Sequence, residues 1–202
     1  MSGDTATAPR RSTLRRAYSF ISHQPRIRKA VMTTPGLRQL AWRFVAGEDL
    51  AAGVAVVRAL NADGILASLN FVGTHVHDRE ETLAATDAAI EALQRINDEQ
   101  LAANLSVKPT QLGLDIDEDF CLLQLRRVVE RAHILGLFVR IDMEEFVYVE
   151  PTLRMFEELR AAFGPDTVGI VIQSYLRDRA SDLERVLDGG SSVRLTKGGY
   201  WE

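Results

Sequence analysis

The chain contains 202 residues, enough for one large domain, and its 46% apolar and 26% charged residues are typical of a globular protein rather than a disordered or fibrous one. The formal net charge of −4 argues against nucleic acid as a partner. A single cysteine, Cys121, excludes an internal disulfide and fits a reducing compartment. No apolar run approaches the roughly 20 residues that cross a bilayer, so we expect a cytoplasmic protein.

Residues 1–47 differ from the rest of the chain in charge. They contain nine Arg or Lys residues and one acid, Asp4. We therefore predict two regions, a basic, partly disordered and partly helical leader over 1–47 and a folded domain over 48–202. The Arg-rich stretch suits an amphipathic helix lying on the inner membrane surface, and it equally suits a solvated leading helix. The sequence leaves both readings of the leader open.

From residue 48 onward, helix-like and strand-like segments alternate. Helices are predicted over 48–62, 79–100, 117–135, 150–163 and 181–189, and strands over 65–72, 104–110, 137–143, 167–173 and 192–197. The strands recur about every 30 residues, which is the length of a βαβ unit. This alternation predicts a parallel sheet that is covered by helices.

The polar residues at the strand ends favour a barrel over an open sheet. An open dinucleotide-binding sheet needs a glycine-rich turn after its first strand, and "NFVGTHVHD" is not G-x-G-x-x-G. Function at the carboxyl ends of many strands is typical of a (β/α)8 TIM barrel. Only five strands are visible, so we predict an α/β, TIM-barrel-like fold that is incomplete, with about five of eight βα units and an N-terminal helical segment. The polar residues at the strand ends are Lys108, Asp142, Glu144, Gln173, Arg194 and Lys197.

Two of these strand ends carry candidates for binding a small charged molecule. Lys108 at a strand end would bind a carboxylate or pair with Asp142 on the next strand, and a plain structural ion pair is the alternative. Asp142 and Glu144 share one side of an extended chain, because alternate residues face the same way. They would orient a cationic or hydroxylated ligand, or act as acids at a helix N-terminus.

The final stretch "VRLTKGGYWE" suits a flat, charged ligand. Arg194 and Lys197 would hold phosphate or favour a reduced flavin. The glycines Gly198 and Gly199 would let a ligand approach the backbone, and the aromatic pair that follows would cover it by stacking. An aromatic pair can also be core filling or part of an interface.

A metal site is the rival interpretation of "THVHD". His75 and His77 would face the same way, as in metal-dependent barrel hydrolases. The remaining histidines are His23, in the leader, and His133, inside a predicted helix. The cluster cannot be completed within this chain, so no metal is expected.

Five stretches together resemble the proline dehydrogenase family. The segments "RFVAGEDLAAGVAVVRALNADGILASLNFVG", "NLSVKPTQLGLDIDEDFC" and "LFVRIDMEE" are similar to the family's entry helix with its first strand, its second strand and its third-strand I-D-M-E motif. The segments "GIVIQSYLRDRASDLE" and "VRLTKGGYWE" resemble its fourth strand and its R-L-V-K-G-A-Y motif. The resemblance covers about residues 43–202, in family order and spacing.

The resemblance implies a distorted (β/α)8 barrel that binds FAD and oxidises L-proline to Δ1-pyrroline-5-carboxylate, with electrons passing to a membrane quinone. It assigns Lys108 to the substrate carboxylate, Asp142 to shaping the pocket and Tyr200 to packing on the proline ring. It assigns FAD to Gln173, Arg194, Lys197, Gly198, Gly199 and Trp201.

The chain also departs from the family pattern. Asn70 and Thr74 stand where the family usually has acids, Pro109 follows Lys108, and Glu145 and Phe146 replace small residues. The family continues for three more strands and a helix with a paired arginine that clamps the proline carboxylate. Without those strands the first and fifth strands would be open edges, so we expect activity to be in doubt. The alternative is a non-catalytic barrel remnant, or half of a split enzyme that acts through a partner.

Overall fold

The computed structural model describes residues 45–47, 49–73, 75–176 and 179–200. The chain divides into two units, Met1–Asp49 and Leu50–Glu202, and the second holds every helix and strand described below. The predicted leader therefore lies almost entirely outside the described residues. In chain order the elements are α4 (Leu50–Ala62), β1 (Ala67–Asn70), α5 (Arg79–Asp98), β2 (Ala103–Val107), the 3-10 helix η1 (Pro109–Leu112), α6 (Glu118–Leu135), β3 (Val139–Ile141), α7 (Phe146–Phe163), β4 (Val168–Gln173), α8 (Ala180–Asp188) and β5 (Val193–Thr196).

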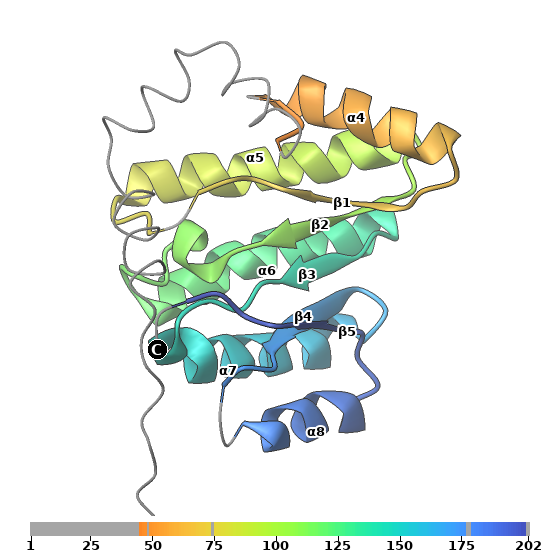
Figure 1. Cartoon of the computed structure of the whole chain (residues 1–202). Coiled ribbons are helices and arrows are strands. Elements are labelled where there is room, and N and C mark those ends of the chain that lie inside the picture. Colours follow the sequence, from red (N-terminus) through yellow and green to blue (C-terminus); the bar gives the residue numbers. More distant parts are fainter. Residues whose placement is uncertain (1–44, 48, 74, 177–178, 201–202) are drawn as a thin grey trace, which may run out of the picture. The chain divides into compact units, whose positions relative to one another are not determined.

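The five strands form one parallel sheet in the order β1-β2-β3-β4-β5, so each strand pairs with the next one in the sequence. Figure 1 shows the sheet curling, with the helices packed on its outer side and the strands' carboxyl ends toward the left of the view. A doubly wound sheet has helices on both faces and a reversal of strand order. The observed order has no reversal, which confirms the prediction of an incomplete barrel-like fold.

The two faces of the sheet differ in polarity because successive side chains of a strand point to opposite sides. On the helix side, Leu105, Val139, Ile141 and Ile170 are fully buried, together with Phe156 of α7. Each such side chain contributes roughly 1.5–3 kcal/mol relative to an exposed position. The inner face carries polar residues instead, so the core lies between the sheet and its helices and the inner face is left to the site.

Helix α7 begins at Phe146, four residues before the predicted start at Glu150. In the structure Pro151 lies inside the helix. Its missing N–H leaves the Val147 carbonyl, four residues earlier, without its intrahelical donor, so one hydrogen bond near the start of the helix is lost.

Pro109, a departure from the family pattern, is accommodated because β2 ends two residues before it. Lys108 is the N-cap of η1 and Pro109 is its first residue. At that position the missing proline N–H costs nothing, since the first N–H groups of a helix have no intrahelical partner. The predicted second strand, 104–110, therefore stops at Val107.

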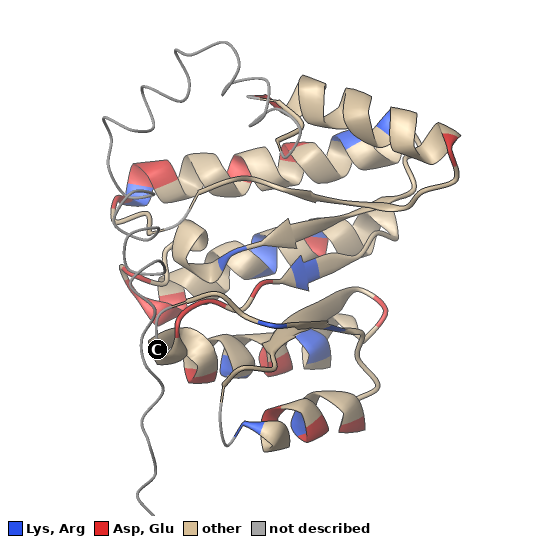
Figure 2. Ribbon diagram, in the orientation of Figure 1, with Lys and Arg blue, Asp and Glu red and all other residues tan. Residues whose placement is uncertain are grey.

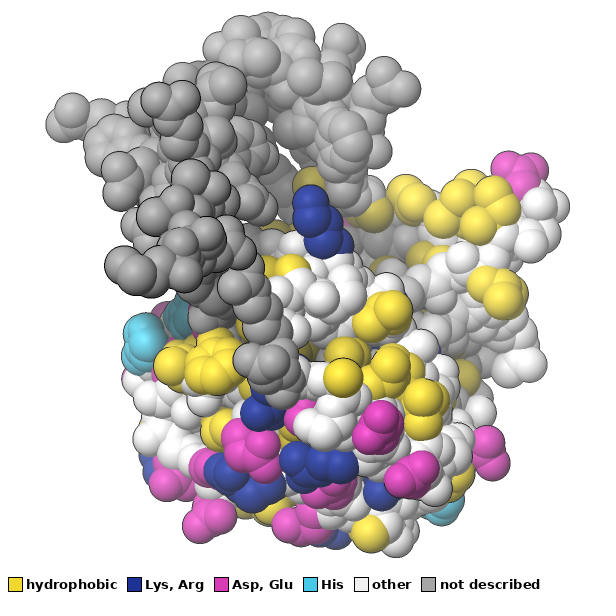
Figure 3. Space-filling view, turned by 60° about the horizontal axis from the view of Figure 1, so that its bottom comes forward, with side chains coloured by type: hydrophobic (Ala, Val, Ile, Leu, Met, Phe, Trp, Pro, Cys, Tyr) yellow, Lys and Arg dark blue, Asp and Glu magenta, His cyan; other side chains and the backbone are white. Residues whose placement is uncertain are grey.

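Helix α8 buries little of its own surface and is attached to α7 by ion pairs. Its buried residues are Asp182 and Val186. Arg185 reaches Glu157 at 3.0 Å, and Arg179, just before α8, reaches Glu150 at 3.3 Å. Figure 3 shows basic and acidic side chains interspersed over this face. Such half-exposed pairs are individually weak, so α8 is held by several small contributions.

Gly169 of β4 allows two segments to approach closely on the inner face of the sheet. A Cβ atom at this position would lie 2.4 Å from the Ser192 carbonyl oxygen and 2.5 Å from Cζ of Phe138. Arg140 crosses the same place and donates to the Ser192 carbonyl at 3.2 Å. Only glycine leaves room for this arrangement.

The substitution Gly169→Ala should therefore lower the free energy of unfolding by about 1–3 kcal/mol, because the added methyl group overpacks a site bounded by backbone. Urea unfolding followed by circular dichroism would measure the loss. Gly199→Ala is the matched control, since a Cβ there meets nothing within 4 Å. Equal stability of the two variants would contradict the proposed close approach.

Candidate functional site

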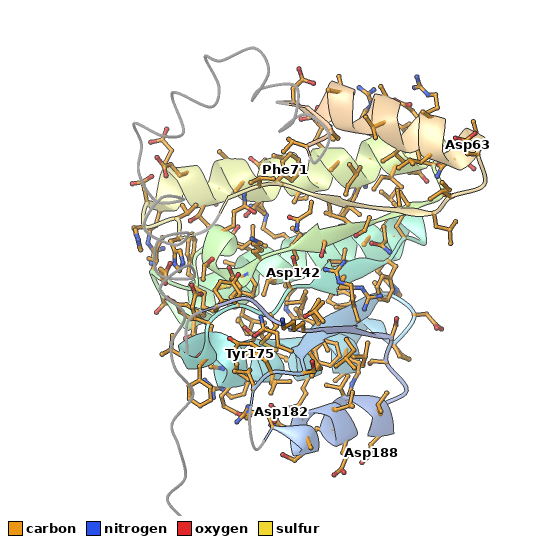
Figure 4. All side chains as sticks on the ribbon, in the orientation of Figure 1. Asp63, Phe71, Asp142, Tyr175, Asp182 and Asp188 are labelled. Carbon is orange, nitrogen blue, oxygen red and sulfur yellow. The ribbon has the colours of Figure 1, made fainter. Side chains whose placement is uncertain are left out.

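The carboxyl ends of the strands bring residues from four strands around one carboxylate. Asp142 directly follows β3 and is only 8% exposed. The register aligns Val107 with Ile141 and Gln173 with Thr196, so the strand ends lie at one edge of the sheet. Figure 4 places Asp142 at this edge, near the middle of the sheet. We call this edge, with the loops that follow the strands, the rim.

The Asp142 carboxylate accepts hydrogen bonds from three other strands. Ser106 Oγ of β2 donates at 2.6 Å, Asn70 Nδ2 of β1 donates at 3.1 Å, and the Arg194 guanidinium of β5 pairs with the same carboxylate. Arg194 also donates to Ser106 Oγ at 2.9 Å. Pairing with Asp142 was one of two roles considered for Lys108, and among the described residues the cation that pairs with Asp142 is Arg194.

Asn70 stands where the family resemblance predicts an acid, and its hydrogen bond to Asp142 explains why an amide suits this position. The amide of Asn70 donates to Asp142 Oδ2, which its carboxylate counterpart cannot do when ionised. Two ionised carboxylates at this distance would repel each other. The exchange of Asp for Asn therefore leaves Asp142 with a third donor and one negative charge fewer beside it.

Glu144 forms a separate buried cluster rather than joining Asp142. It is fully buried and accepts from Thr110, at 2.9 Å from the backbone N–H and at 2.7 Å from the hydroxyl. Burial raises the pKa of Glu144, and the two Thr110 hydrogen bonds and the nearby Lys108 charge oppose that rise. The strand ends at Ile141, so the expected sharing of one extended face by Asp142 and Glu144 is not realised.

Gln173 carries a buried oxygen without a partner. This last residue of β4 is 5% exposed, and its Nε2 donates to the Met143 carbonyl at 2.9 Å. Its Oε1 is buried and accepts no hydrogen bond from the residues that the structure describes. A buried acceptor without a donor is costly, and it can mark the place of a ligand N–H group.

The segment after β5 runs on alongside the segment after β4. The Lys197 carbonyl accepts from the Tyr175 N–H at 3.1 Å, and the Lys197 side chain is exposed. Gly198 has φ of 89°, and a Cβ there would lie 2.0 Å from the Tyr175 ring. The close approach expected for a ligand at Gly198 is thus occupied by Tyr175, whereas Gly199 has open space beside it.

Tyr200 is half-buried near the acidic part of the rim. Burial raises the pKa of its phenol, and the negative charge of Glu144 raises it further. Figure 2 shows the acidic colour concentrated on the segment that follows β3. Trp201, predicted to cover a flavin, lies outside the described residues.

His75 lies between two carboxylates on the rim. Its Nδ1 is 2.9 Å from Asp115 Oδ2, and its Nε2 is 3.3 Å from Glu145 Oε1. Asp115 also accepts from the Tyr148 hydroxyl. Asp115 and Tyr148 were not expected beside His75, because no spacing in the sequence links these segments. Among the described residues no group of histidine, cysteine and acidic side chains could hold a metal ion.

Cys121 is inert and structural. It is fully buried in α6 and its thiol donates to the Pro109 carbonyl at 3.4 Å. Burial raises the pKa of this thiol, so the reactive thiolate is disfavoured. The only cysteine therefore supports packing rather than chemistry.

A cavity of about 480 Å³ lies at the other end of the strands. It is lined by Asn104, Phe138, Arg140, Pro165, Asp166, Gly190, Ser191 and Ser192. Arg140 in its wall is already bonded to Ser192. In barrel enzymes the amino-terminal end serves stability and the carboxyl end carries chemistry, so the rim is the stronger candidate. No helix in the described part of the chain could span a membrane.

Comparison with known proteins identifies relatives of this chain. The family profile described as proline dehydrogenase matches residues 54–202. "Proline dehydrogenase 1" of Bacillus subtilis strain 168 is 33% identical over 189 residues, covering 94% of this chain and 62% of the relative. "Proline dehydrogenase" of Deinococcus radiodurans is also 33% identical, covering 87% of this chain and 61% of the relative. The chain thus spans about three fifths of these relatives' length.

Solved structures show the same fold. Proline utilization A (PutA) from Bdellovibrio bacteriovorus, inactivated by N-propargylglycine, superposes with a TM-score of 0.72 at 24% identity, covering 82% of this chain and 21% of that one. PutA from Corynebacterium freiburgense gives a TM-score of 0.62 at 24% identity, covering 92% of this chain and 21% of that one. At this identity the likeness concerns the fold.

The Thr110 hydroxyl should stabilise the rim through Glu144. We expect Thr110→Val to lower the free energy of unfolding by about 1–3 kcal/mol at pH 7, because a buried carboxylate loses a donor. Thr152→Val is the matched control, since Thr152 is equally buried and its Oγ1 has no partner among the described residues. Urea unfolding should show little loss for Thr152→Val, and equal losses in both variants would contradict the assignment.

Proposed function

This chain belongs to the proline dehydrogenase family, and we propose that it serves the flavin-dependent oxidation of L-proline to Δ1-pyrroline-5-carboxylate in proline catabolism. The observation that carries the proposal is the Asp142 cluster, in which β1, β2, β3 and β5 contribute to one polar site at the rim. Barrel enzymes carry their chemistry at this end of the strands.

The rim offers groups that suit FAD. The buried Oε1 of Gln173 would accept a hydrogen bond from an N–H of the flavin ring, which would remove the cost of leaving it without a partner. The cationic Arg194, held in place by Asp142, would favour negative charge on the ring. When bound, FAD supplies the acceptor for the electron pair of the substrate. We assign Gln173, Arg194, Lys197, Gly199 and Trp201 to holding it, whereas the Tyr175 ring fills the space beside Gly198.

Lys108 is well placed to bind the substrate carboxylate. It caps η1 at the rim and makes no ion pair with any acid among the described residues, although its charge acts on Glu144. A cation that is not used internally can serve a ligand. Asp142 would keep Arg194 and Ser106 in position, and Tyr200 would pack on the proline ring. We assign Lys108, Asp142 and Tyr200 to the substrate side of the site.

The remaining assignments concern the surroundings of the enzyme. We propose a membrane quinone as the electron acceptor, a cytoplasmic location, and peripheral contact with the inner membrane through the basic residues 1–47. Residues 48–202 would form the barrel part. The nine basic residues of the leader support an attraction to anionic lipid, which weakens as salt screens it.

A second candidate function is a half-barrel that acts through a partner. Within the described sheet β1 and β5 each have one neighbouring strand. Leu66 beside β1 is 78% exposed and Leu195 in β5 is 60% exposed. Edge strands with exposed apolar residues are ready to pair with further strands. A polypeptide that supplies the remaining βα units would complete the site.

Flavin binding and proline-dependent dye reduction distinguish the two candidates. We expect the purified full chain to bind FAD, seen as a flavin absorbance that survives gel filtration, and L-proline to reduce a dye acceptor. A chain that binds no FAD alone, and gains both properties with the remaining βα units of the Bacillus subtilis relative, would support the second candidate. If the chain neither binds FAD nor reduces the dye, both alone and together with the remaining βα units, the proposed activity would be refuted.

Lys108→Met should raise KM for proline about tenfold or more, which corresponds to about 1.4 kcal/mol, while leaving the flavin content unchanged. Gln173→Leu should weaken FAD binding instead. Arg58→Met removes an exposed cation on α4 that pairs with Glu99, and it should change neither quantity. Steady-state kinetics and flavin titration provide both readouts, and an unchanged KM in Lys108→Met would overturn the assignment of Lys108.

A further inference from the structure

One side chain, His75, joins three loops of the rim. It lies between β1 and α5, and its ring contacts Asp115, in the segment before α6, and Glu145, immediately before α7. These three segments follow three successive strands. No other ring of the described residues bridges two carboxylates in this way.

The backbone around His75 is fixed to the same rim. The His75 N–H donates to Thr110 Oγ1 at 3.2 Å, and the Val76 N–H donates to the Thr110 carbonyl at 3.1 Å. His75 has φ of 58°, a left-handed conformation that a non-glycine residue adopts at a cost. Favourable contacts must offset that cost, and the two carboxylates are the strongest contacts that the side chain makes.

The groups facing His75 are predominantly acidic. Asp115 and Glu145 contact the ring, and Tyr148 of α7 donates its hydroxyl to Asp115. That hydrogen bond raises the pKa of Tyr148 to about 12, so it stays neutral near pH 7. Glu144 lies behind Thr110, and His77 Nδ1 is 3.9 Å from Asp115. Apart from His77, the charged groups around the ring are therefore negative.

A neutral imidazole has one donor and one acceptor nitrogen, whereas the protonated ring has two donors. Both ring nitrogens of His75 meet a carboxylate oxygen. Only the protonated ring satisfies both contacts, because in the neutral form one carboxylate faces a lone pair. The two contacts are therefore fully made in one protonation state alone.

We propose that protonated His75 is a positioning residue that acts as a clasp, fastening residues 75–78 to the loops after β2 and β3 and releasing them as the proton is lost. The clasp ends where α5 begins, since Asp78 is the N-cap of that helix. The clasp is also linked to the buried Glu144 of the rim, because Thr110 accepts a hydrogen bond from the His75 N–H and donates its own N–H to Glu144. The inference stands independently of the proposed activity.

The direction of the pH dependence follows from the folded-state pKa. Burial alone lowers the pKa of His75, but the hydrogen bonds and charges of Asp115 and Glu145 outweigh it and raise the pKa above 6.5. A raised folded pKa means that the stabilisation is complete below about pH 6.5, the unfolded value, and is lost as pH rises through the folded pKa. The clasp is thus closed in mild acid and open in alkali.

Hydrogen exchange of the Val76 amide provides the test in the full chain. Protection factors, which remove the intrinsic pH dependence of exchange, should fall about tenfold or more between pH 6 and pH 9 relative to the Val139 amide. The Val139 amide bonds to the Thr167 carbonyl in the sheet and serves as an internal reference. NMR titration of the His75 ring should give a midpoint above 6.5.

Three variants separate the clasp from general loosening. His75→Asn should give low, pH-independent Val76 protection, whereas His77→Asn, on the same segment, should behave as the native chain. Glu145→Gln keeps a similar shape and should lower the titration midpoint of His75. If His75→Asn does not fold, the titration midpoint of His75 in Glu145→Gln is the deciding measurement. An unchanged midpoint in Glu145→Gln, or native pH dependence in His75→Asn, would overturn the proposal.

Discussion

The site depends on one buried carboxylate. Asp142 is 8% exposed and receives donors from Asn70, Ser106 and Arg194, so it joins β1, β2 and β5 to β3 at one edge of the sheet. A buried charge is tolerable only when it is paired and hydrogen-bonded, which makes these side chains mutually dependent. The ion pair with Asp142 also fixes the position of Arg194, a residue that we assign to FAD binding. Glu144 with Thr110 repeats this arrangement beside it, and His75 adds the loop after β1.

The curled parallel sheet explains why polar groups can gather on one side without weakening the core. The helix-facing side chains of Leu105, Val139, Ile141 and Ile170 are fully buried in one core with residues of α5, α6 and α7, which supplies the hydrophobic stabilisation. The positions on the inner face are then available for polar residues such as Ser106, Asp142 and Arg194. Gly169 shows how tightly this inner face is packed, since a methyl group there would collide with the Ser192 backbone. Stability and site are thus assigned to opposite faces of the same strands.

The two edge strands of the described sheet, β1 and β5, are the feature of the fold that bears on whether the chain is active. Relatives of this chain are longer, and the chain spans about three fifths of their length. The described β1 and β5 have one neighbour each, and Leu66 and Leu195 beside these edges are exposed. The polar cluster around Asp142 is nevertheless complete within the five strands. The donors to the Asp142 carboxylate therefore come from β1, β2 and β5, while β1 and β5 each keep one edge without a neighbouring strand in the described sheet.

The sequence by itself determined the alternation of strands and helices, because periods of 2 and 3.6 reflect local backbone geometry. It also placed Lys108, Asp142 and Gln173 at strand ends, whereas Arg194 is the second residue of β5. The resemblance to the proline dehydrogenase family is confirmed by the family comparison. Only the tertiary structure decided the partners: Arg194 rather than Lys108 for Asp142, Thr110 for Glu144, and Asp115 with Glu145 for His75. It also decided that α7 begins at Phe146, four residues before the predicted start, and that Tyr175 occupies the space at Gly198. Such contacts join residues tens of positions apart, and they are set by sheet register and loop path, which local sequence patterns do not encode.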